Sequence, residues 1–482
     1  MADRTKATWA FAITAVALFM TALDSLVVTT ALPVIKQDLD ASLAGLEWTV
    51  NAYTLTFAVL LLTGAALGDR FGRKRLFIIG LVVFTTGSAA AALANSTGTL
   101  VAARAIQGIG GAIVTPLTLT ILSAAVPPAR RGVALGAWGA VSGLAIALGP
   151  LVGGAVVQGL SWHWIFWLNV PIGLVALPLA AARLTETTGP DRALDLPGLA
   201  LASAGLFGVV FGLVRGNDQG WGSLGVAGPL TVGGLLLVAL LAWELRAAAP
   251  MIPMRFFHSR GFSAANATSL LLFFGMFGSI FLLTQFLQLI RGYSPLEAGI
   301  RTLPWTGMLV LVGPVAGALS DRIGSRSLVV AGMALVAAAL AWLAAVATPA
   351  VPYAALVAPF VLAGAGMSLF FAPTANAVLS AVSRAEEGKA SGVLNTIRQV
   401  GGVLGVAVLA TVFSAAGGYM SPGAFVDGLA WALWAGAAMV GLGAIAALGI
   451  SGRQAALPRQ VAGQATGGRR MPRPATTWEK AS

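Results

Sequence analysis

The stretch Leu67-Gly68-Asp69-Arg70-Phe71-Gly72-Arg73-Lys74-Arg75 joins two long apolar segments of the chain. A weaker copy, Leu319-Ser320-Asp321-Arg322-Ile323-Gly324-Ser325-Arg326, joins two apolar segments of the second half. The glycines that follow also repeat at equal spacing: Gly108, Gly110, Gly132, Gly136 and Gly149 recur as Gly364, Gly366, Gly388, Gly392 and Gly405. One architectural unit is therefore encoded twice, which in an apolar chain is typical of a pseudo-symmetric membrane transporter.

The composition indicates that most of the chain lies in lipid. Hydrophobic residues make up 57% of it and charged residues 10%, a far more apolar balance than in soluble proteins. Apolar segments long enough to span a bilayer, roughly 20 residues each, repeat from end to end. They predict an all-α membrane protein with fourteen transmembrane helices, at about 9–31, 46–68, 76–95, 100–125, 133–158, 163–183, 194–214, 224–245, 262–290, 298–319, 327–347, 352–380, 391–415 and 427–450.

The repeat fixes the order of these helices as six, two and six. The first six match the last six, so the two helices between them form an insertion without a counterpart. We expect an amino-terminal bundle at 1–185, the insertion at 186–250 and a second bundle at 251–452. The segment 453–482, rich in Gly, Pro, Arg and Gln, is expected to be a disordered cytoplasmic tail.

The distribution of basic residues predicts the orientation in the membrane. On the side opposite the amino terminus the loops carry Lys36, Arg215, Arg291 and Arg301, whereas nearly all other Lys and Arg residues fall on the amino-terminal side. Both termini are therefore expected in the cytoplasm, in the cell (inner) membrane of a bacterial-type cell. The net charge of +12 is explained by this topology, so we expect no nucleic-acid partner.

The sequence gives little support to an enzyme. The chain has no cysteine and no phosphate-binding Gly-x-x-x-x-Gly-Lys-Ser/Thr loop, and we expect no cofactor and no metal. His163 stands between two tryptophans at a predicted membrane edge, where interfacial packing is favoured over catalysis.

Three charged side chains lie well within predicted spans: Asp24, Arg104 and Arg398. Each costs at least ~2.5 kcal/mol in a helix centre unless it faces a wet cavity or a partner. Asp24 and Arg104 fall at similar depths in the outer half of the membrane, so they are expected to pair. Two interpretations stay open: a permanent ion pair that holds two helices together, and a carboxylate that is alternately protonated and paired during transport.

Polar residues of the second half predict another part of the cavity wall. Asn395, Arg398 and Gln399 share one helix face, and Gln285 and Gln288 lie with Thr284 on another helix. Hydrogen bonding between helices is an equally good interpretation of the two glutamines. In the first half, Asn51 and Tyr53 could line the rim of the cavity or pack within the bundle.

Several motifs resemble those of a known family. The loop at 67–75 resembles the signature loop of the major facilitator superfamily, with Ala65 in place of its usual first glycine and Gly64 one position earlier. Leu100-x-x-x-Arg104-x-x-Gln107-Gly108-x-Gly110 is similar to the family's helix-four motif, and Ala147-Leu148-Gly149-Pro150-Leu151-Val152-Gly153-Gly154 to that of its antiporters. Together with the stretches 23–33 and 161–173, the helix count is similar to that of the fourteen-helix drug/proton antiporters. The resemblance covers residues 9–450 and implies the major facilitator fold, with Arg104 acting in proton coupling.

Two further motifs have physical roles that follow from their residues. In the loop, Gly72 permits a tight turn, and Asp69 could face the positive helix terminus near Ser391 as a cytoplasmic latch, while Arg70 and Arg73 hold the loop at the inner leaflet. A purely topological role is the alternative for Arg73, Lys74 and Arg75, and it is favoured for at least two of the three. Gly149, Pro150, Gly153 and Gly154 allow close approach and bending of the fifth helix.

These features predict proton-coupled export of amphipathic small molecules such as drugs or antibiotics, by alternating access of two bundles in a monomer. Because Asp24 is the one clearly embedded acid, neutral, weakly charged or monocationic substrates are favoured over multivalent cations. The alternative is an uptake symporter of the same fold. A receptor with a silent transporter fold is disfavoured by the cost of its buried charges.

Overall fold

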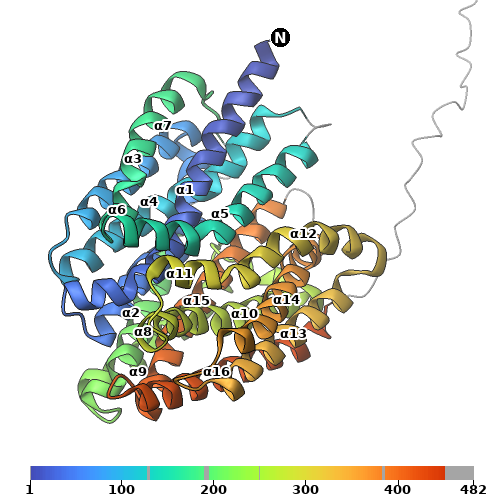
Figure 1. Cartoon of the computed structure of the whole chain (residues 1–482). Helices are drawn as coiled ribbons and strands as arrows, with labels where there is room; N and C mark the ends of the chain where they lie inside the picture. Colours follow the sequence, from blue (N-terminus) through green and yellow to red (C-terminus); the bar gives the residue numbers. More distant parts are fainter. Residues whose placement is uncertain (1, 128–130, 189–194, 249, 383–385, 451–482) are drawn as a thin grey trace, which may run out of the picture.

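The computed structural model describes residues 2–127, 131–188, 195–248, 250–382 and 386–450, so the predicted tail lies outside the described residues. Described secondary structure is helical throughout. The first half contains α1 (Ala2–Asp38), α2 (Leu43–Phe71), α3 (Arg73–Ala92), α4 (Thr97–Ala125), α5 (Arg131–Gly159), α6 (Trp164–Trp167) and α7 (Asn169–Arg183). We call the end of the molecule where α1 begins the near end, and the end where α1 stops, at Asp38, the far end (Figure 1).

The second half of the chain follows two further helices, α8 (Leu196–Gln219) and α9 (Leu224–Glu244). Its elements are the 3-10 turn η2 (Met254–His258), α10 (Arg260–Gln285), the π turn η3 (Phe286–Ile290), α11 (Pro295–Arg301), α12 (Leu303–Ile323), α13 (Ser325–Val346), α14 (Tyr353–Leu379), α15 (Glu387–Ala416) and α16 (Pro422–Ala447).

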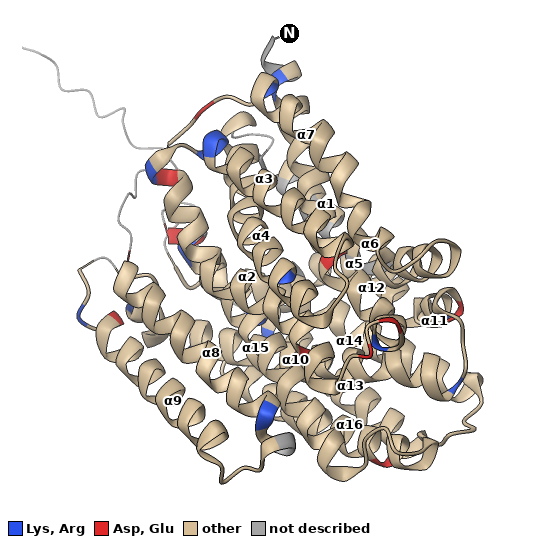
Figure 2. Ribbon diagram, turned by 90° about the vertical axis from the view of Figure 1, so that its left-hand side faces the viewer, with Lys and Arg blue, Asp and Glu red and all other residues tan. Residues whose placement is uncertain are grey.

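Twelve segments among the described residues are long and apolar enough to cross a membrane. The helices α5 and α12 are 29 and 21 residues long, but their described apolar parts are shorter, Leu148–Gly159 and Leu303–Gly313. Figure 2 shows charged residues gathered towards helix ends and tan ribbon along most of the helix length. Each predicted span overlaps a described helix, and the departures are local: the expected helix at 76–95 ends at Ala92, and those at 163–183 and 298–319 are interrupted after Trp167 and after Arg301.

The repeated glycines explain why the two halves pack alike. A Cβ atom on Gly108 would lie 2.5 Å from a backbone oxygen of α2, and one on Gly364 would lie 2.1 Å from a backbone oxygen of α12. Gly110 and Gly366 are equally close to the backbones of α3 and α13, at 2.4 and 2.5 Å. No side chain fits at these distances, so the repeated glycines bring the central helix of each half against its two neighbours.

The insertion packs on the outside of the molecule. Figure 1 shows α8 and α9 side by side near α2, and α8 contacts both α2 and α15. The shared core is apolar, with Leu55 and Val59 of α2, Val210 and Val214 of α8 and Val403 of α15. The insertion therefore covers the seam between the two halves and leaves the space between α1, α5, α10 and α12 to form a cavity.

Candidate transport site

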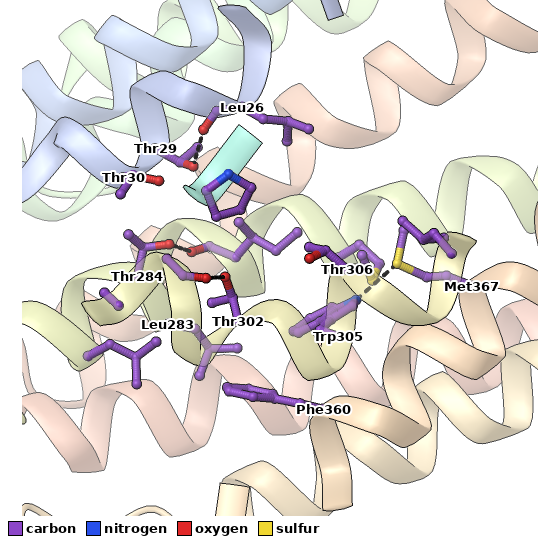
Figure 3. A pocket seen from close by; sticks show the side chains of 17 residues that line it. Leu26, Thr29, Thr30, Leu283, Thr284, Thr302, Trp305, Thr306, Phe360 and Met367 are labelled. Atoms are coloured by element: carbon purple, nitrogen blue, oxygen red, sulfur yellow. Dashed lines mark hydrogen bonds between the residues drawn. The ribbon is translucent and has the colours of Figure 1, made fainter. Parts of the chain in front are cut away.

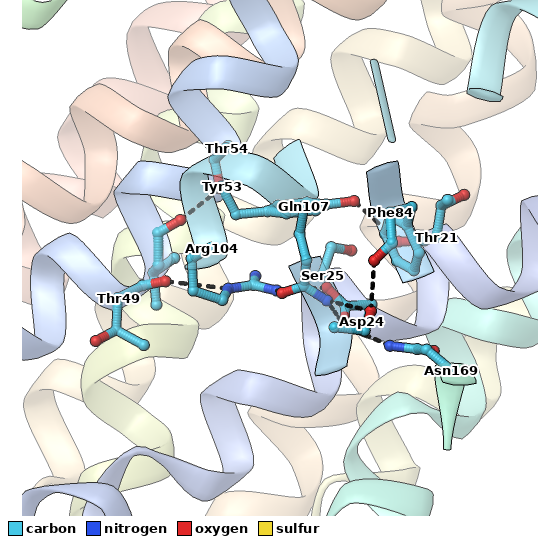
Figure 4. Close-up of polar contacts among 12 residues, drawn as sticks. Thr21, Asp24, Ser25, Thr49, Tyr53, Thr54, Phe84, Arg104, Gln107 and Asn169 are labelled. Carbon is cyan, nitrogen blue, oxygen red and sulfur yellow. Dashed lines mark hydrogen bonds and ion pairs between the residues drawn. The ribbon is translucent and has the colours of Figure 1, made fainter. Parts of the chain in front are cut away.

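The predicted pair of Asp24 and Arg104 is formed, and it is almost completely buried. Nη1 of Arg104 lies 2.5 Å from Oδ2 of Asp24, and each side chain is 1% exposed. Nε of the same arginine donates to the backbone oxygen of Thr49 at 3.3 Å, which fixes the guanidinium plane. The contact joins the middle of α1 to the first turns of α4 (Figure 4).

Two amides complete the shell of Asp24. Nδ2 of Asn169 donates to Oδ1 at 2.9 Å, and Nε2 of Gln107 donates to the same oxygen at 3.2 Å. Gln107 also accepts from Arg104 at 2.9 Å and donates to Ser88 at 2.7 Å. One guanidinium and two amides thus donate to the carboxylate of Asp24, and such charge-assisted hydrogen bonds are stronger than neutral ones. The network therefore connects α1, α3, α4 and α7 around one titratable group.

A cavity of about 220 Å³ lies between the two halves, beside this network. Ala22 and Ser25 line it, whereas Asp24 between them turns away into the first half. Tyr53 connects the two sites, because its side chain lines the cavity and its ring centroid lies 4.3 Å from Cζ of Arg104. A substrate in the cavity would therefore contact the wall directly in front of the ion pair.

The residues predicted to form a second wall of the cavity lie in two different places. Asn395, Arg398 and Gln399 of α15 all line it, as their common helix face suggested. Arg398 lies among three aromatic rings of α10 and α14, with its Cζ 5.4 to 5.7 Å from their centroids.

Three predicted cavity residues lie outside the lining. Asn51 is fully buried within the first bundle. Gln285 is also fully buried and accepts a hydrogen bond from Tyr419, and Gln288 donates to the backbone oxygen of Thr30 at 2.7 Å. The two glutamines lie beyond the cavity towards the far end, where Gln288 joins the second half to α1 and Gln285 joins α10 to the segment between α15 and α16. Their polarity is thus used for contacts between helices, one of the two interpretations open at the sequence level.

A smaller space of about 60 Å³ continues from the cavity towards the far end. Figure 3 shows Thr29 and Thr30 of α1 facing Thr284 of α10 and Thr302, beside Trp305 of α12. This lining is nearly all apolar or hydroxyl-bearing, and it contains no charged residue among the described ones. The cavity thus extends along α1 from Leu18 to Thr30.

Beyond this space the two halves are packed tightly together. A Cβ on Gly154 of α5 would lie 2.3 Å from the backbone oxygen of Pro295, and one on Gly299 would lie 2.3 Å from that of Pro150. The α5 glycines also pack on α1, since a Cβ on Gly149 would lie 2.9 Å from Leu26. A Cβ on Gly153 would lie 3.0 Å from the backbone oxygen of Val27. The predicted close-approach motif therefore lies in the contact that closes the far end.

A polar cluster reinforces this closure. Nζ of Lys36 lies 3.1 Å from the ring centroid of Tyr419, which connects α1 to the segment between α15 and α16. Burial raises the pKa of the Tyr419 phenol, and the negative charge of Glu47 raises it further, so the phenol stays neutral and can donate to Gln285. Sequence reasoning missed this cluster because its members are far apart in the chain.

The loop between α2 and α3 makes its contacts within the first half. Gly72 adopts a φ of +108°, the turn conformation predicted for it, and Arg73 donates to Asp69 at 2.8 Å. Glu186 caps the first turn of α3 by accepting from the backbone N–H groups of Lys74 and Arg75, at 3.0 and 3.2 Å. Arg70 lies over the Phe71 ring.

The sequence predicted a latch between Asp69 and a helix terminus near Ser391, and the structure differs from that prediction. The helix begins four residues earlier, at Glu387, so Ser391 is not at its terminus. Glu386 stands at its amino-terminal cap and pairs with Arg255. Two acidic residues therefore already complement this helix dipole, while the carboxylate of Asp69 is bound by Arg73.

Sequence reasoning also missed Gln107, Asn169 and Glu186. Gln107 follows Arg104 by three residues on the same helix face, and Asn169 is a lone amide in an apolar run. Both signals were readable, but neither indicated that the two amides converge on Asp24. His163 stacks on Trp162 at 3.7 Å between centroids, in agreement with a packing role.

A comparison with protein-family models identifies the fold. The model described as Major Facilitator Superfamily matches residues 14–406, and a second match covers 267–480. The chain belongs to the Major Facilitator Superfamily. Two solved structures of transporters in which the fold is recognisable are a bacterial homologue of the lysosomal transporter Spinster, in an inward-facing conformation, and the peptide transporter POT. The Spinster homologue has a TM-score of 0.64 at 17% identity, over 92% of this chain and 96% of its own. The peptide transporter has a TM-score of 0.66 at 16% identity, over 91% of this chain and 94% of its own.

Curated relatives of this superfamily member are considerably more similar in sequence. The tetracenomycin C resistance and export protein of Streptomyces glaucescens is 36% identical over 85% of this chain and 76% of its own. The cephamycin export protein of Amycolatopsis lactamdurans is 39% identical over 84% and 85%. The puromycin resistance protein of Streptomyces alboniger is 36% identical over 87% and 86%.

Proposed function

We propose that this transporter exports amphipathic small molecules such as antibiotics in exchange for protons, by alternating access of its two halves. The observation that carries the proposal is the position of Asp24, a buried titratable group directly behind the wall of the cavity between the halves. The names of its relatives, which are antibiotic export and resistance proteins, support export over other uses of the fold.

The network suggests how a proton is coupled to transport. Protonation of Asp24 would neutralise the partner of Arg104 and leave a buried guanidinium without its counter-charge. That state is costly in a membrane interior, so Arg104 and the Tyr53 ring that covers it would rearrange. Because Tyr53 lines the cavity, the same rearrangement alters the substrate site, and substrate binding must in turn alter protonation.

We propose fourteen membrane spans in a six, two and six arrangement, with α5 and α12 added to the twelve segments described above. Both are helices long enough to cross the bilayer at 1.5 Å per residue. Both termini would lie in the cytoplasm of the cell (inner) membrane and the far end would face outside, so the closed far end corresponds to an inward-facing state. We expect lipid contact over the outer helix faces and a functional monomer.

Proteoliposomes with an internal pH dye test this proposal. Substrate that enters the vesicle down its gradient drives protons out in an antiporter and in with a symporter, so the sign of the internal pH change distinguishes export from uptake. Candidate substrates come from a growth-inhibition panel of antibiotics with and without expression. Alkalinisation by a panel compound supports antiport, and acidification overturns it in favour of a symporter.

Asp24→Asn tests the assigned residue in the same vesicles. The amide keeps the size of the side chain and loses its titration, so proton movement should stop. Asp427→Asn is the matched control, because Asp427 lies exposed on α16, away from the cavity. Wild-type proton movement by Asp24→Asn would remove Asp24 from the coupling mechanism.

A further inference from the structure

Arg398 is a partly buried arginine in the wall of the cavity, and its surroundings differ from those of Arg104. Arg104 faces Asp24 at 2.5 Å and donates to Thr49 and Gln107 as well. Arg398 lies in the wall of the cavity, and its Nε and Nη2 atoms are buried without a hydrogen-bond partner among the described residues. The guanidinium of Arg104 thus has acceptors for its N–H groups, whereas two nitrogen atoms of the Arg398 guanidinium have none among the described residues.

The aromatic rings around Arg398 do not engage those donors. Phe273, Phe370 and Phe371 lie with their centroids 5.4 to 5.7 Å from Cζ, at the distance of cation–π contacts. Such contacts stabilise the charge of the guanidinium but leave its N–H groups without acceptors, which is costly in a buried site. The rings orient the guanidinium, and its unpaired N–H groups favour a ligand that brings acceptors.

The rest of the cavity wall supplies no counter-charge. Its described lining includes the neutral amides Asn395 and Gln399, the hydroxyls of Ser25 and Tyr53, and otherwise mainly apolar and aromatic side chains, with Arg398 the one charged group among them. In a low-dielectric space, an unpaired cation favours an anion and disfavours a second cation. The wall is therefore electrostatically suited to a substrate with one negative charge.

The shape of the site restricts the rest of the substrate. Rings from both halves line the cavity, including Tyr53, Phe57, Trp138 and Phe277, and flat aromatic groups pack well against such surfaces. The volume of about 220 Å³ lies below the ~300–1,000 Å³ of ordinary drug sites, so this conformation accommodates a compact ring system.

We propose that Arg398 recognises a planar oxyanion, such as a carboxylate, on a flat aromatic amphiphile, and that this anion is the substrate class of the cavity. The proposal rests on the export function above and names its substrate. It narrows the expectation of neutral, weakly charged or monocationic substrates, which came from counting acids in the sequence and did not consider the charge of Arg398.

Three probes with one ring system and different charges test this. They are 2-naphthoate, 2-naphthamide and 2-naphthylmethylammonium, and their binding is measured by calorimetry on purified protein in nanodiscs of zwitterionic lipid, with empty nanodiscs subtracted. We expect wild type to bind the carboxylate at least about tenfold more tightly than the isosteric amide, because hydrogen bonds to charged groups exceed neutral ones by this order. The ammonium should bind more weakly than the amide.

Variants assign the preference to one side chain. Arg398→Gln removes the charge and should reduce carboxylate affinity to that of the amide, whereas Arg398→Lys should retain part of the preference without the planar fork. Arg215→Gln is the matched control, because Arg215 also lies over a phenylalanine ring, at 3.9 Å, but on α8 and outside the lining. It should leave all three affinities unchanged.

The wild-type comparison decides the proposal even where a variant fails to fold. Equal or tighter binding of the amide or the ammonium would overturn it, as would a carboxylate preference that survives Arg398→Gln in folded protein. Export is assessed separately by proton movement with the antibiotic panel. If the wild-type protein prefers the carboxylate but moves no panel compound, the proposed export function is contradicted and the substrate assignment stands. If it exchanges only cations for protons, the export function stands and the substrate assignment is contradicted.

Discussion

The contact of Gly154 with α11 allows a direct test of alternating access. Substitution by alanine places a methyl group 2.3 Å from the backbone oxygen of Pro295, where an ordinary contact is at least 3.4 Å. The obstacle is backbone, so no rotamer change relieves it. The two helices must separate by about 1 Å or the far end must open, and overpacking of this kind costs about 1–3 kcal/mol.

This cost applies to the closed far end, because the contact is lost when the two halves separate there. The ratio of outward-open to inward-facing molecules should therefore rise by roughly 5- to 150-fold. Since the chain has no cysteine, Thr284→Cys in the lining beneath the closure gives a single reporter. Its reaction with a membrane-impermeant thiol reagent added from outside should accelerate in the Gly154→Ala background.

Gly159→Ala is the matched control on the same helix, because a Cβ there meets nothing within 4 Å. It should react at the rate of the reporter alone. An unchanged rate in Gly154→Ala, in protein that remains folded and inserted, would show that this contact does not hold the far end closed. A rate that rises equally in both variants would attribute the effect to helix propensity.

Three further predictions concern the polar sites. Arg104→Ala leaves the buried Asp24 carboxylate without its counter-charge, so substrate-driven proton movement in proteoliposomes should be lost, and wild-type proton movement in folded protein would contradict the coupling of the pair. Asp69→Asn removes the partner of Arg73, so crosslinking of engineered cysteines across the near end should change by the roughly twofold expected of an i,i+4 ion pair, and unchanged crosslinking would contradict a gating role for this pair. The Ser294 backbone N–H lowers the pKa of Glu297 in the cap of α11, so the cap is stabilised above the ordinary carboxyl pKa and loses this support as pH falls through the lowered value. Labelling of Thr284→Cys from outside, divided at each pH by the labelling rate of a free thiol to correct for the thiolate fraction, should accelerate on acidification, and Glu297→Gln should remove that acceleration.

Much of the fold could be predicted from the sequence because its physical causes are local. In lipid, the backbone N–H and C=O groups of an apolar segment must be hydrogen-bonded within a helix, so the positions of the apolar segments predicted the helices and their approximate bounds. The repeated glycines predicted two similar halves, since a glycine that permits close approach has the same use in each copy. Pairing of Asp24 with Arg104 was predictable because an isolated charge is costly at that depth.

The details of the site depended on three-dimensional packing. Nothing in the spacing of Gln107 and Asn169 shows that both amides reach the same carboxylate oxygen, because the rotation of α4 and α7 about their axes is set by neighbouring helices. From the sequence, the glutamines of α10 and η3 could equally have bound a ligand or formed hydrogen bonds between helices. In the folded protein they are hydrogen-bonded to Thr30 and Tyr419 at the far end. The sequence by itself determined that charges in the membrane would need partners. The tertiary structure decided which of these charges has a partner. Arg104 pairs with Asp24 within the first half, whereas Arg398 faces the cavity between the two halves, whose described lining holds no acidic residue.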